Sequence, residues 1–342
     1  MTSNVAARAA GWALVATITL GATGARAQAP ERTEAQQREI VSLATIVGAA
    51  LQGQIVPTEG PFAWANDYLK STEQTTFIPF TLSIEQAKLS TPSVAMYIFV
   101  VEAGATATPP DADGETPVLP TPTFEDAYHV DLGAPTPTGT YEIRRGFWAP
   151  AGRYDVYVAL SESGVPDGTE ARTMMLKEAV DVPDMWGRRL TTSSIIQASR
   201  IEPLQAPPPD DQQLANPYTL GTMRIVPKSG TSYSTGEELS IVFLVYNAGL
   251  TPSGLPDVEI DYTFNTRAAA GVEYFNRTNP QVFNEQTLPP GFDLAAGHQL
   301  VAGQAIPLSL FPAADYQLEI TVTDKTNGAS LTRTVDFSVS VS

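Results

Sequence analysis

Two histidines, His129 and His298, are the only imidazoles in this 342-residue chain. Nucleophilic catalysis of the Ser-His-acid type needs one as its base. His129 lies in Tyr128-His-Val-Asp131, whose alternation predicts a strand with the imidazole on its surface, and His298 follows Gly297 in a predicted turn. Neither neighbours a Gly-x-Ser-x-Gly pattern, the mark of the α/β-hydrolase nucleophile. We therefore expect a protein that is not an enzyme.

Carboxylates are abundant, with 37 Asp and Glu against 20 Lys and Arg. Glycoside hydrolysis needs two acids that face each other about 5 to 9 Å apart, and no pair stands out by its spacing. Asp111, Asp113 and Glu115 resemble the start of a calcium loop, because hard cations prefer several oxygens on a short segment. The acid expected at the twelfth position is replaced by Pro122. An acidic loop is favoured, and no metal or other cofactor is predicted.

Two tryptophans at the ends of predicted strands are the candidate binding residues. Trp148 lies in Gly146-Phe-Trp-Ala-Pro150, and Trp186 lies in Pro183-Asp-Met-Trp-Gly187. Aromatic side chains on the rim of a β-sandwich can stack on sugar rings or anchor a protein partner, because they supply a large rigid area at low entropic cost. They plug the ends of sandwiches at least as often, so a structural role stays open beside the binding role.

The first residues have the form of an export signal. Arg8 precedes an apolar run from Ala9 to Leu20, and the small-residue site Ala25-Arg26-Ala27 follows. We expect residues 1–27 to be removed. Since that segment holds two Arg and no acid, its loss changes the net charge from −17 to −19. Such an acidic surface repels nucleic acid and anionic membranes, where each phosphate needs a cation to replace its counterions.

Cysteine is absent, which excludes disulfides, thiolate catalysis and cysteine-ligated zinc. After residue 27 no segment approaches the roughly 20 apolar residues of a membrane span. The longest candidate, Ile40 to Leu51, is too short. The mature chain is therefore expected to be soluble and to have no membrane span.

Residues 33–53 predict one amphipathic helix, within an N-terminal helix and connector over residues 28–70. Thr33-Glu-Ala-Gln36 has the form of a capping box. Apolar residues follow at helical spacing: Ile40, Leu43, Ala44, Val47, Ala50 and Leu51. This stripe must be buried. The first β-domain is the favoured surface, and a groove on a partner is the alternative.

From Thr76 the apolar period changes to two, as in β-strands. Short runs rich in Val, Ile, Tyr, Phe and Thr are bounded by Pro, Gly and Asp: Phe77–Leu82, Val94–Val101, Ala127–Leu132, Tyr141–Trp148, Arg153–Leu160 and Thr173–Val182. Regularly spaced short strands without long helical windows predict a sandwich. We assign it residues 71–200, with an exposed Pro/Thr-rich loop at 104–123.

The Pro-rich residues 201–217 predict a stiff linker, and residues 218–342 predict a second β-sandwich. Its strand Leu239 to Tyr246 is apolar on both faces. One face can join the core, but the face with Val242, Leu244 and Tyr246 also needs a cover. A loop of this domain or of its neighbour is favoured over a partner protein.

One motif occurs twice, as Pro150-Ala-Gly-Arg-Tyr154 and Pro312-Ala-Ala-Asp-Tyr316. In each copy the Pro lies four residues before a Tyr that opens an alternating strand, and a turn and a second strand follow. The second turn contains Asn327-Gly328, which suits the positive φ of tight hairpins. We predict that each Tyr is buried at the end of its sandwich, as in the tyrosine corner of immunoglobulin-like folds.

Three stretches of the second half carry a resemblance: Asn216-Pro-Tyr-Thr-Leu-Gly221, Gly236-Glu-Glu-Leu-Ser-Ile-Val-Phe-Leu-Val-Tyr246 and Asp315-Tyr-Gln-Leu-Glu-Ile-Thr-Val-Thr-Asp-Lys325. Over about residues 190–342 the chain resembles the C-terminal β-sandwich region of exported acidobacterial proteins, either related to von Willebrand factor A proteins or named for a GWxTD motif. That motif and the von Willebrand domain are absent, and Ala314 replaces the usual Gly. The resemblance implies a fold and bacterial export, and it carries no catalytic residue.

Together these observations predict an all-β protein: two tandem immunoglobulin- or fibronectin-III-like antiparallel β-sandwiches with an N-terminal amphipathic helix. The expected function is non-catalytic binding or scaffolding in the bacterial cell envelope through an envelope protein partner, in the periplasm or the extracellular medium. The alternative is a carbohydrate-binding module or polysaccharide-active enzyme that uses Trp148 or Trp186 beside an acid.

Overall fold

The computed structural model describes residues 32–54, 56, 62–108, 118–166, 168–209, 212–269 and 271–341. This part of the chain is mostly β, with several sheets and one α-helix, which confirms the predicted fold class. The predicted export signal at 1–27 and the acids Asp111, Asp113 and Glu115 lie outside the described residues. No helix in the described ranges is long and apolar enough to cross a membrane.

The chain divides into two compact units, and each is made of several segments. The first unit comprises Met1–Ala63, Ser83–Ile143 and Arg153–Val180, and the second comprises Trp64–Leu82, Arg144–Gly152 and Asp181–Ser342. The Pro-rich stretch 201–217 lies within the second unit, where its first residues complete a strand.

In the first unit a four-stranded sheet has the order β5-β4-β7-β8. Its strands are β4 (Ser93–Glu102), β5 (Phe124–Asp131), β7 (Gly152–Glu162) and β8 (Thr173–Val182). β4 pairs antiparallel with β5 and with β7. Every residue from Val94 to Val101 is buried, as are Val156 to Leu160. Neither face of the two central strands is therefore exposed to solvent.

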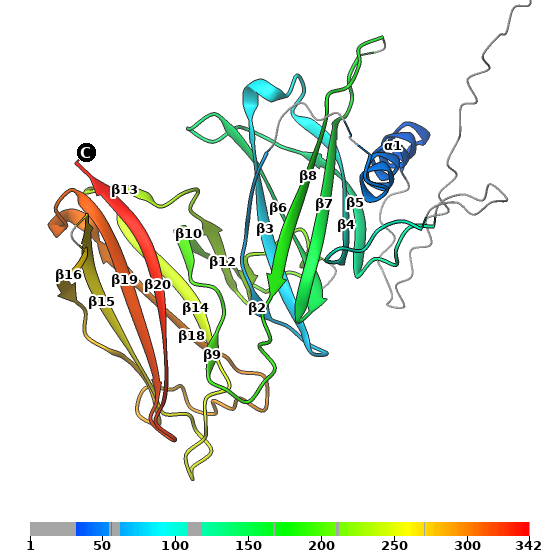
Figure 1. The fold of residues 1–342 in the computed structure, drawn as a ribbon. Coiled ribbons are helices and arrows are strands. Elements are labelled where there is room, and N and C mark those ends of the chain that lie inside the picture. Colours follow the sequence, from blue (N-terminus) through cyan, green and yellow to red (C-terminus); the bar gives the residue numbers. More distant parts are fainter. Residues whose placement is uncertain are drawn as a thin grey trace, which may run out of the picture. The chain divides into compact units, whose positions relative to one another are not determined.

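Helix α1 (Glu34–Leu51) packs on this sheet, as Figure 1 shows beside β4 and β5. The predicted capping box is present: the Thr33 hydroxyl accepts from the backbone of Gln36, and the Gln36 side chain accepts from the backbone of Thr33. The apolar stripe meets aromatic side chains of β4 and β7, among them Tyr97, Phe99 and Tyr157. The helix is thus buried by its own unit, as the sequence favoured.

Another sheet is built around β3, which pairs with β1, β2 and β6. The bounds are β1 (Ala63–Asn66), β2 (Leu69–Lys70), β3 (Thr75–Glu85) and β6 (Thr140–Pro150). The division between the two units falls inside β3, after Leu82, and inside β6, after Ile143. A short 3-10 helix, η1 (Gln86–Lys88), follows β3.

The second unit contains two six-stranded sheets, visible as two layers in Figure 1. One has the order β11-β12-β10-β14-β18, with β9 also on β14, and the other the order β13-β20-β19-β15-β16, with β17 on β15. Pairing is antiparallel except for the parallel pair β13–β20.

The strand bounds of the first of these sheets are β9 (Thr191–Thr192), β10 (Ile196–Pro203), β11 (Thr219–Leu220), β12 (Met223–Pro227), β14 (Glu238–Tyr246) and β18 (Leu300–Pro307). Those of the second are β13 (Ser232–Ser234), β15 (Val258–Ala268), β16 (Gly271–Arg277), β17 (Gln281–Phe283), β19 (Ala314–Asp324) and β20 (Ala329–Ser340). The 3-10 helix η3 (Leu308–Leu310) follows β18. One core of side chains from both sheets joins them into a sandwich.

The central strand β14 is buried on both faces. Ile241, Phe243 and Val245 join the core between the sheets. On the other face, Val242 packs with Ile196, Tyr218 and Ile225. Leu244 and Tyr246 pack with Leu69, Phe77 and Met185. The cover that the sequence required is supplied by this unit itself, from segments on both sides of the Pro-rich stretch and from the β2–β3 region.

Tyr316 closes one end of the sandwich core, as its motif predicted. Its side chain is fully buried, at 0% exposure, and its hydroxyl donates to the backbone oxygen of Pro312 at 2.8 Å. The ring lies 5.2 Å from Phe311 and 5.3 Å from Phe337 between centroids. The bond back to Pro312 is the geometry of a tyrosine corner. Tyr154, in the first copy of the motif, is buried as well.

Asp324 holds the turn between β19 and β20. Its carboxylate, which is fully buried, accepts from the backbone of Gly249 at 2.7 Å, from the backbone and hydroxyl of Thr326 at 2.9 and 2.6 Å, and from the Asn327 amide at 2.9 Å. Burial raises the pKa of Asp324, but these donors together outweigh burial and leave the pKa below its usual value. The ionised side chain therefore stabilises the hairpin.

Replacing Tyr316 with Ala should lower the free energy of unfolding by about 3 to 5 kcal/mol, because it removes a large buried ring and leaves a cavity. Tyr316→Phe is the matched control and should cost about 1 kcal/mol, the value of one hydrogen bond. Urea unfolding followed by circular dichroism measures both. An Ala variant as stable as the wild type would contradict the assigned role.

Asp324→Asn should destabilise the protein by about 1 to 3 kcal/mol at neutral pH, because an amide nitrogen cannot accept the donors that now meet the carboxylate. Since the folded pKa lies below the unfolded value, the contribution is present above about pH 4 and is lost as the pH falls through the folded pKa. Thermal melts of wild type and variant across acid pH should therefore converge. A gap that widens on acidification would contradict this sign.

Candidate functional site

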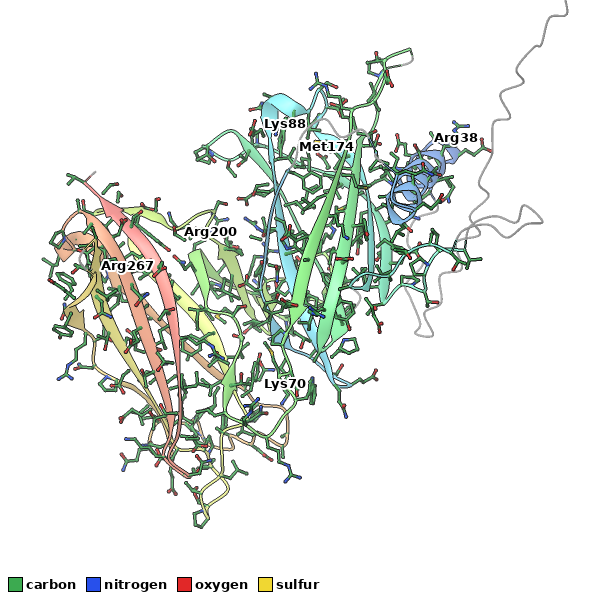
Figure 2. All side chains as sticks on the ribbon, viewed as in Figure 1. Arg38, Lys70, Lys88, Met174, Arg200 and Arg267 are labelled. Carbon is green, nitrogen blue, oxygen red and sulfur yellow. The ribbon has the colours of Figure 1, made fainter. Side chains whose placement is uncertain are left out.

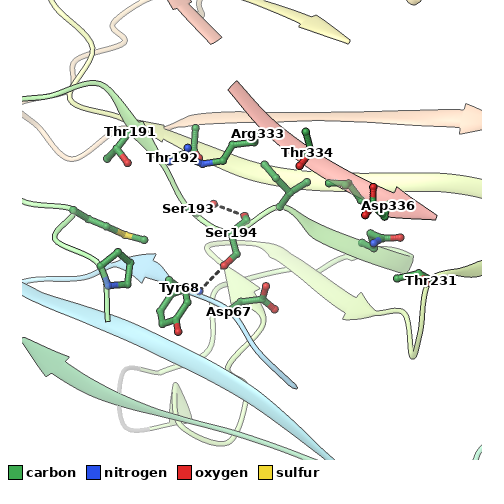
Figure 3. A pocket seen from close by; sticks show the side chains of 15 residues that line it. Asp67, Tyr68, Thr191, Thr192, Ser193, Ser194, Thr231, Arg333, Thr334 and Asp336 are labelled. Carbon is green, nitrogen blue, oxygen red and sulfur yellow. Dashed lines mark hydrogen bonds between the residues drawn. The ribbon is translucent and has the colours of Figure 1, made fainter. Parts of the chain in front are cut away.

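A cleft of about 550 Å³, lined by both polar and apolar groups, lies in the second unit (Figure 3). One wall is the segment Thr191–Ile195, which joins β9 to β10, and the other is Arg333–Asp336 of β20. Asp67 and Tyr68 approach the same space from the chain just before β2. The cleft therefore lies where the two sheets of the sandwich meet at one side, and it is lined largely by hydroxyl and charged side chains.

A β-bulge opens the first wall. Thr192 pairs with Val245 of β14, and Ile196 pairs with Val242. The two paired positions are three residues apart on β14 but four residues apart on the facing chain. The extra residue takes the chain out of the ladder. Two serines satisfy the backbone there. The Ser193 hydroxyl accepts from the backbone of Leu244 at 2.9 Å, and the Ser194 hydroxyl accepts from the backbone of Tyr68 at 2.9 Å. Serine hydroxyl oxygens thus accept the backbone hydrogen bonds that carbonyl oxygens of a paired strand would otherwise accept.

The second wall is an open strand edge. In the described part of the chain, β20 pairs with β13 only over Ser338–Ser340, whereas its pairing with β19 runs without a register shift from Ala329 to Val339. The N–H of Ser338 donates to Thr231 beside β13, at 2.9 Å. Backbone N–H groups alternate between the two edges of a strand. Those of Asp336 and Thr334 therefore also point away from β19, toward the open edge.

Asp67 is the acid of the cleft without a cationic partner. Its Oδ2 accepts from the Tyr218 hydroxyl at 3.1 Å, and no Lys, Arg or His among the described residues forms an ion pair with it. Burial by the surrounding protein raises the pKa of Asp67 to about 6, although hydrogen bonds from Tyr218 and Ser194 act against it. Asp67 is partly exposed and is one of the residues that line the cleft.

Neither candidate tryptophan lines the cleft. The Trp148 ring packs on Phe77 at 5.4 Å between centroids. Trp186, with 36% of its surface exposed, donates its indole N–H to the backbone oxygen of Thr75 at 2.9 Å. The ammonium of Lys70, labelled in Figure 2, lies 4.4 Å from the Trp186 ring. Both rings make structural contacts, and only Trp186 keeps substantial exposed area. Whether either binds a ligand stays a prediction.

The histidines are not arranged as catalytic bases of the Ser-His-acid type. In the first unit the Glu39 Oε2 atom meets both His129 Nε2, at 2.8 Å, and the Ser163 hydroxyl, at 2.9 Å. In a catalytic triad the imidazole lies between the serine and the acid. Here the carboxylate of Glu39 lies between His129 and Ser163. His298 Nδ1 accepts from the backbone of Asp293 within a turn, as predicted. The described residues contain no group of three or more His, Asp or Glu that could hold a metal ion.

Sequence reasoning missed the cleft. The hydroxyl run Thr191-Thr-Ser-Ser194 was a visible signal, because it interrupts the apolar alternation before Ile196. Asp67 had no such signal in the sequence, because its neighbours do not distinguish it from the other acids of the chain. Its position depends on contacts with Tyr218 and Ser194, which are more than 100 residues away in sequence.

Asp67→Asn should stabilise the fold at neutral pH. Because the folded pKa of Asp67 lies above its unfolded value, its charge costs stability as the pH rises through about 6. Relative to wild type, the variant should gain about 1 to 3 kcal/mol at pH 8 and nothing below pH 4. Denaturant unfolding at both pH values checks this. Equal stabilities throughout would show that the carboxylate is well solvated.

Neither the protein-family models nor the curated proteins contain a match to this chain. Among solved structures it is similar to trypsin-activated alpha-2-macroglobulin from Escherichia coli, with a TM-score of 0.22, 10% identity and coverage of 84% of this chain and 17% of that one. For the native conformation of the E. coli protein, the TM-score is 0.19 and the sequence identity is 11%, and the match covers 83% of this chain and 16% of that one. The chain thus spans about a sixth of the length of these proteins, and a likeness this low carries no argument about function.

Proposed function

We propose that this chain is an exported, non-catalytic binding or scaffolding protein of the bacterial cell envelope. It holds an envelope protein by adding an extended segment of that partner to the open edge of β20. One observation carries the proposal: Thr334 and Asp336, whose N–H groups point outward, line the cleft and lie beyond the short stretch of β20 that β13 covers.

An open strand edge with aligned donors and acceptors is a template for pairing with another chain. Here the edge is flanked by Arg333 and Asp336 and by hydroxyl side chains. Charged and hydroxyl groups limit indiscriminate aggregation while leaving the backbone free to pair. In strand addition the main chain supplies affinity, and neighbouring pockets select side chains of the partner. The cleft beside β20 offers space for such a side chain.

The sequence is the basis for placing the protein in the cell envelope. Residues 1–27 have the form of a signal peptide, the chain has no cysteine, and the second half resembles a region of exported acidobacterial proteins. The chain would then act in the periplasm or the extracellular medium. The glycan alternative receives less support from the geometry, because Trp148 packs on Phe77 and Trp186 is in contact with Lys70.

A photo-crosslinking residue placed at Thr334 should trap a partner in intact envelopes, because this position borders the open edge. Tyr274 on β16 is the matched control: it is 65% exposed, on another edge strand of the same sheet, and does not line the cleft. Mass spectrometry should map the adduct at Thr334 to one extended segment of the partner.

Hydrogen exchange supplies the second measurement. The amides of Asp336 and Thr334 should become protected when a peptide of the mapped segment is added, whereas amides already bonded to β19 should change little. Identical adducts at Thr334 and Tyr274, or no protection along β20, would count against the proposal.

A further inference from the structure

Asp67 lines the cleft from the chain just before β2. It lines the same space as Arg333–Asp336, and in Figure 3 the Thr191–Ser194 segment lies between it and the β20 strand. The next inference rests on the proposed function, since it concerns which segment the edge accepts.

The carboxylate of Asp67 accepts fewer hydrogen bonds than that of Asp324 in the same unit. The Tyr218 hydroxyl and Ser194 act on it, whereas Asp324 receives four donor contacts. An ionised carboxylate removed from water without a cation is costly. An ammonium or guanidinium group that reached it would form a charge-assisted hydrogen bond, which is about twice as strong as a neutral one.

The other charged side chains that line the cleft, Asp336 and Arg333, already have partners. Asp336 already pairs with Arg267, at 2.5 Å, and accepts from the Gln317 amide at 3.2 Å. Arg333 donates to the backbone oxygen of Thr332 and forms no ion pair with Asp67 in the described ranges. The tyrosines beside Asp67, Tyr68 and Tyr218, have raised pKa values and are neutral. Asp67 is therefore the acid of the cleft that an incoming cation would meet.

We infer that the cleft selects an extended polypeptide segment whose lysine or arginine side chain binds Asp67 while its backbone pairs with β20. The net charge of −17 over the full sequence acts in the same direction, because an acidic protein attracts basic segments and speeds their association. Asp67 then resembles many binding residues in that it is unfavourable for the free protein and useful in the complex.

The test uses the full chain and a pair of ten-residue peptides of alternating Thr and Val. One carries a single central lysine and the other carries acetyl-lysine, which keeps the shape and removes the charge. Fluorescence anisotropy measures the affinity of each. The lysine peptide should bind roughly 10- to 100-fold more tightly, the difference expected for a hydrogen bond to a charged group. Asp67→Asn should abolish this preference.

Asp336→Asn is the matched control, because it removes the other carboxylate of the cleft, which is already paired. It should retain the preference for lysine. If it loses the preference as fully as Asp67→Asn does, general acidity explains the selectivity and the assignment to Asp67 is overturned.

Two further measurements separate this inference from the proposed function. A lysine peptide with methyl groups on alternate backbone nitrogens cannot pair with β20 and should not bind; Thr334→Pro removes an outward donor of β20 and should have the same effect, with a thermal melt to check folding. If the lysine and acetyl-lysine peptides bind equally and the backbone-methylated peptide does not bind, the inference is overturned and the proposed function stays intact. Undiminished binding of the methylated peptide, or no binding of any peptide, overturns both.

Discussion

The second unit is organised by a strand that cannot be exposed on either side. β14 carries Phe243 toward the core of the sandwich and Leu244 and Tyr246 away from it. Each large apolar side chain left in water would cost about 1.5 to 3 kcal/mol, so the outer face requires a second layer. Leu69, Phe77 and Met185 supply part of that layer. Segments far apart in the chain are therefore held on one strand.

The cleft follows from that constraint. The chain that covers β14 must also pair with it, and it does both by pairing at Thr192, bulging through Ser193 and Ser194, and pairing again at Ile196. The bulge lets Ser194 bond to Tyr68, which brings the neighbouring Asp67 to the same space. A packing requirement on apolar residues thus places a cleft that contains Asp67 beside the open edge of β20.

Asp324 and Asp67 show how environment decides the role of a carboxylate. Both are removed from much of their solvent. Asp324 meets four donor contacts and its pKa is lowered, so its charge stabilises a turn. Asp67 meets fewer donors and its pKa is raised to about 6, so its charge is a cost to the free fold. A fold retains such a cost more readily where binding relieves it, which is why we connect Asp67 and not Asp324 with a ligand.

The sequence by itself determined the local features: the alternation of β19, the capping box of α1, the hairpin at Asn327-Gly328, and the buried Tyr316. Each depends on residues a few positions apart, where period and turn chemistry act directly. The same reasoning showed that the outer face of β14 needs a cover. Only the tertiary structure decided that Leu69, Phe77 and Met185 provide it, how the chain divides into units, and that Asp67 stands beside β20. Those outcomes depend on contacts between segments more than 50 residues apart, which no local pattern encodes.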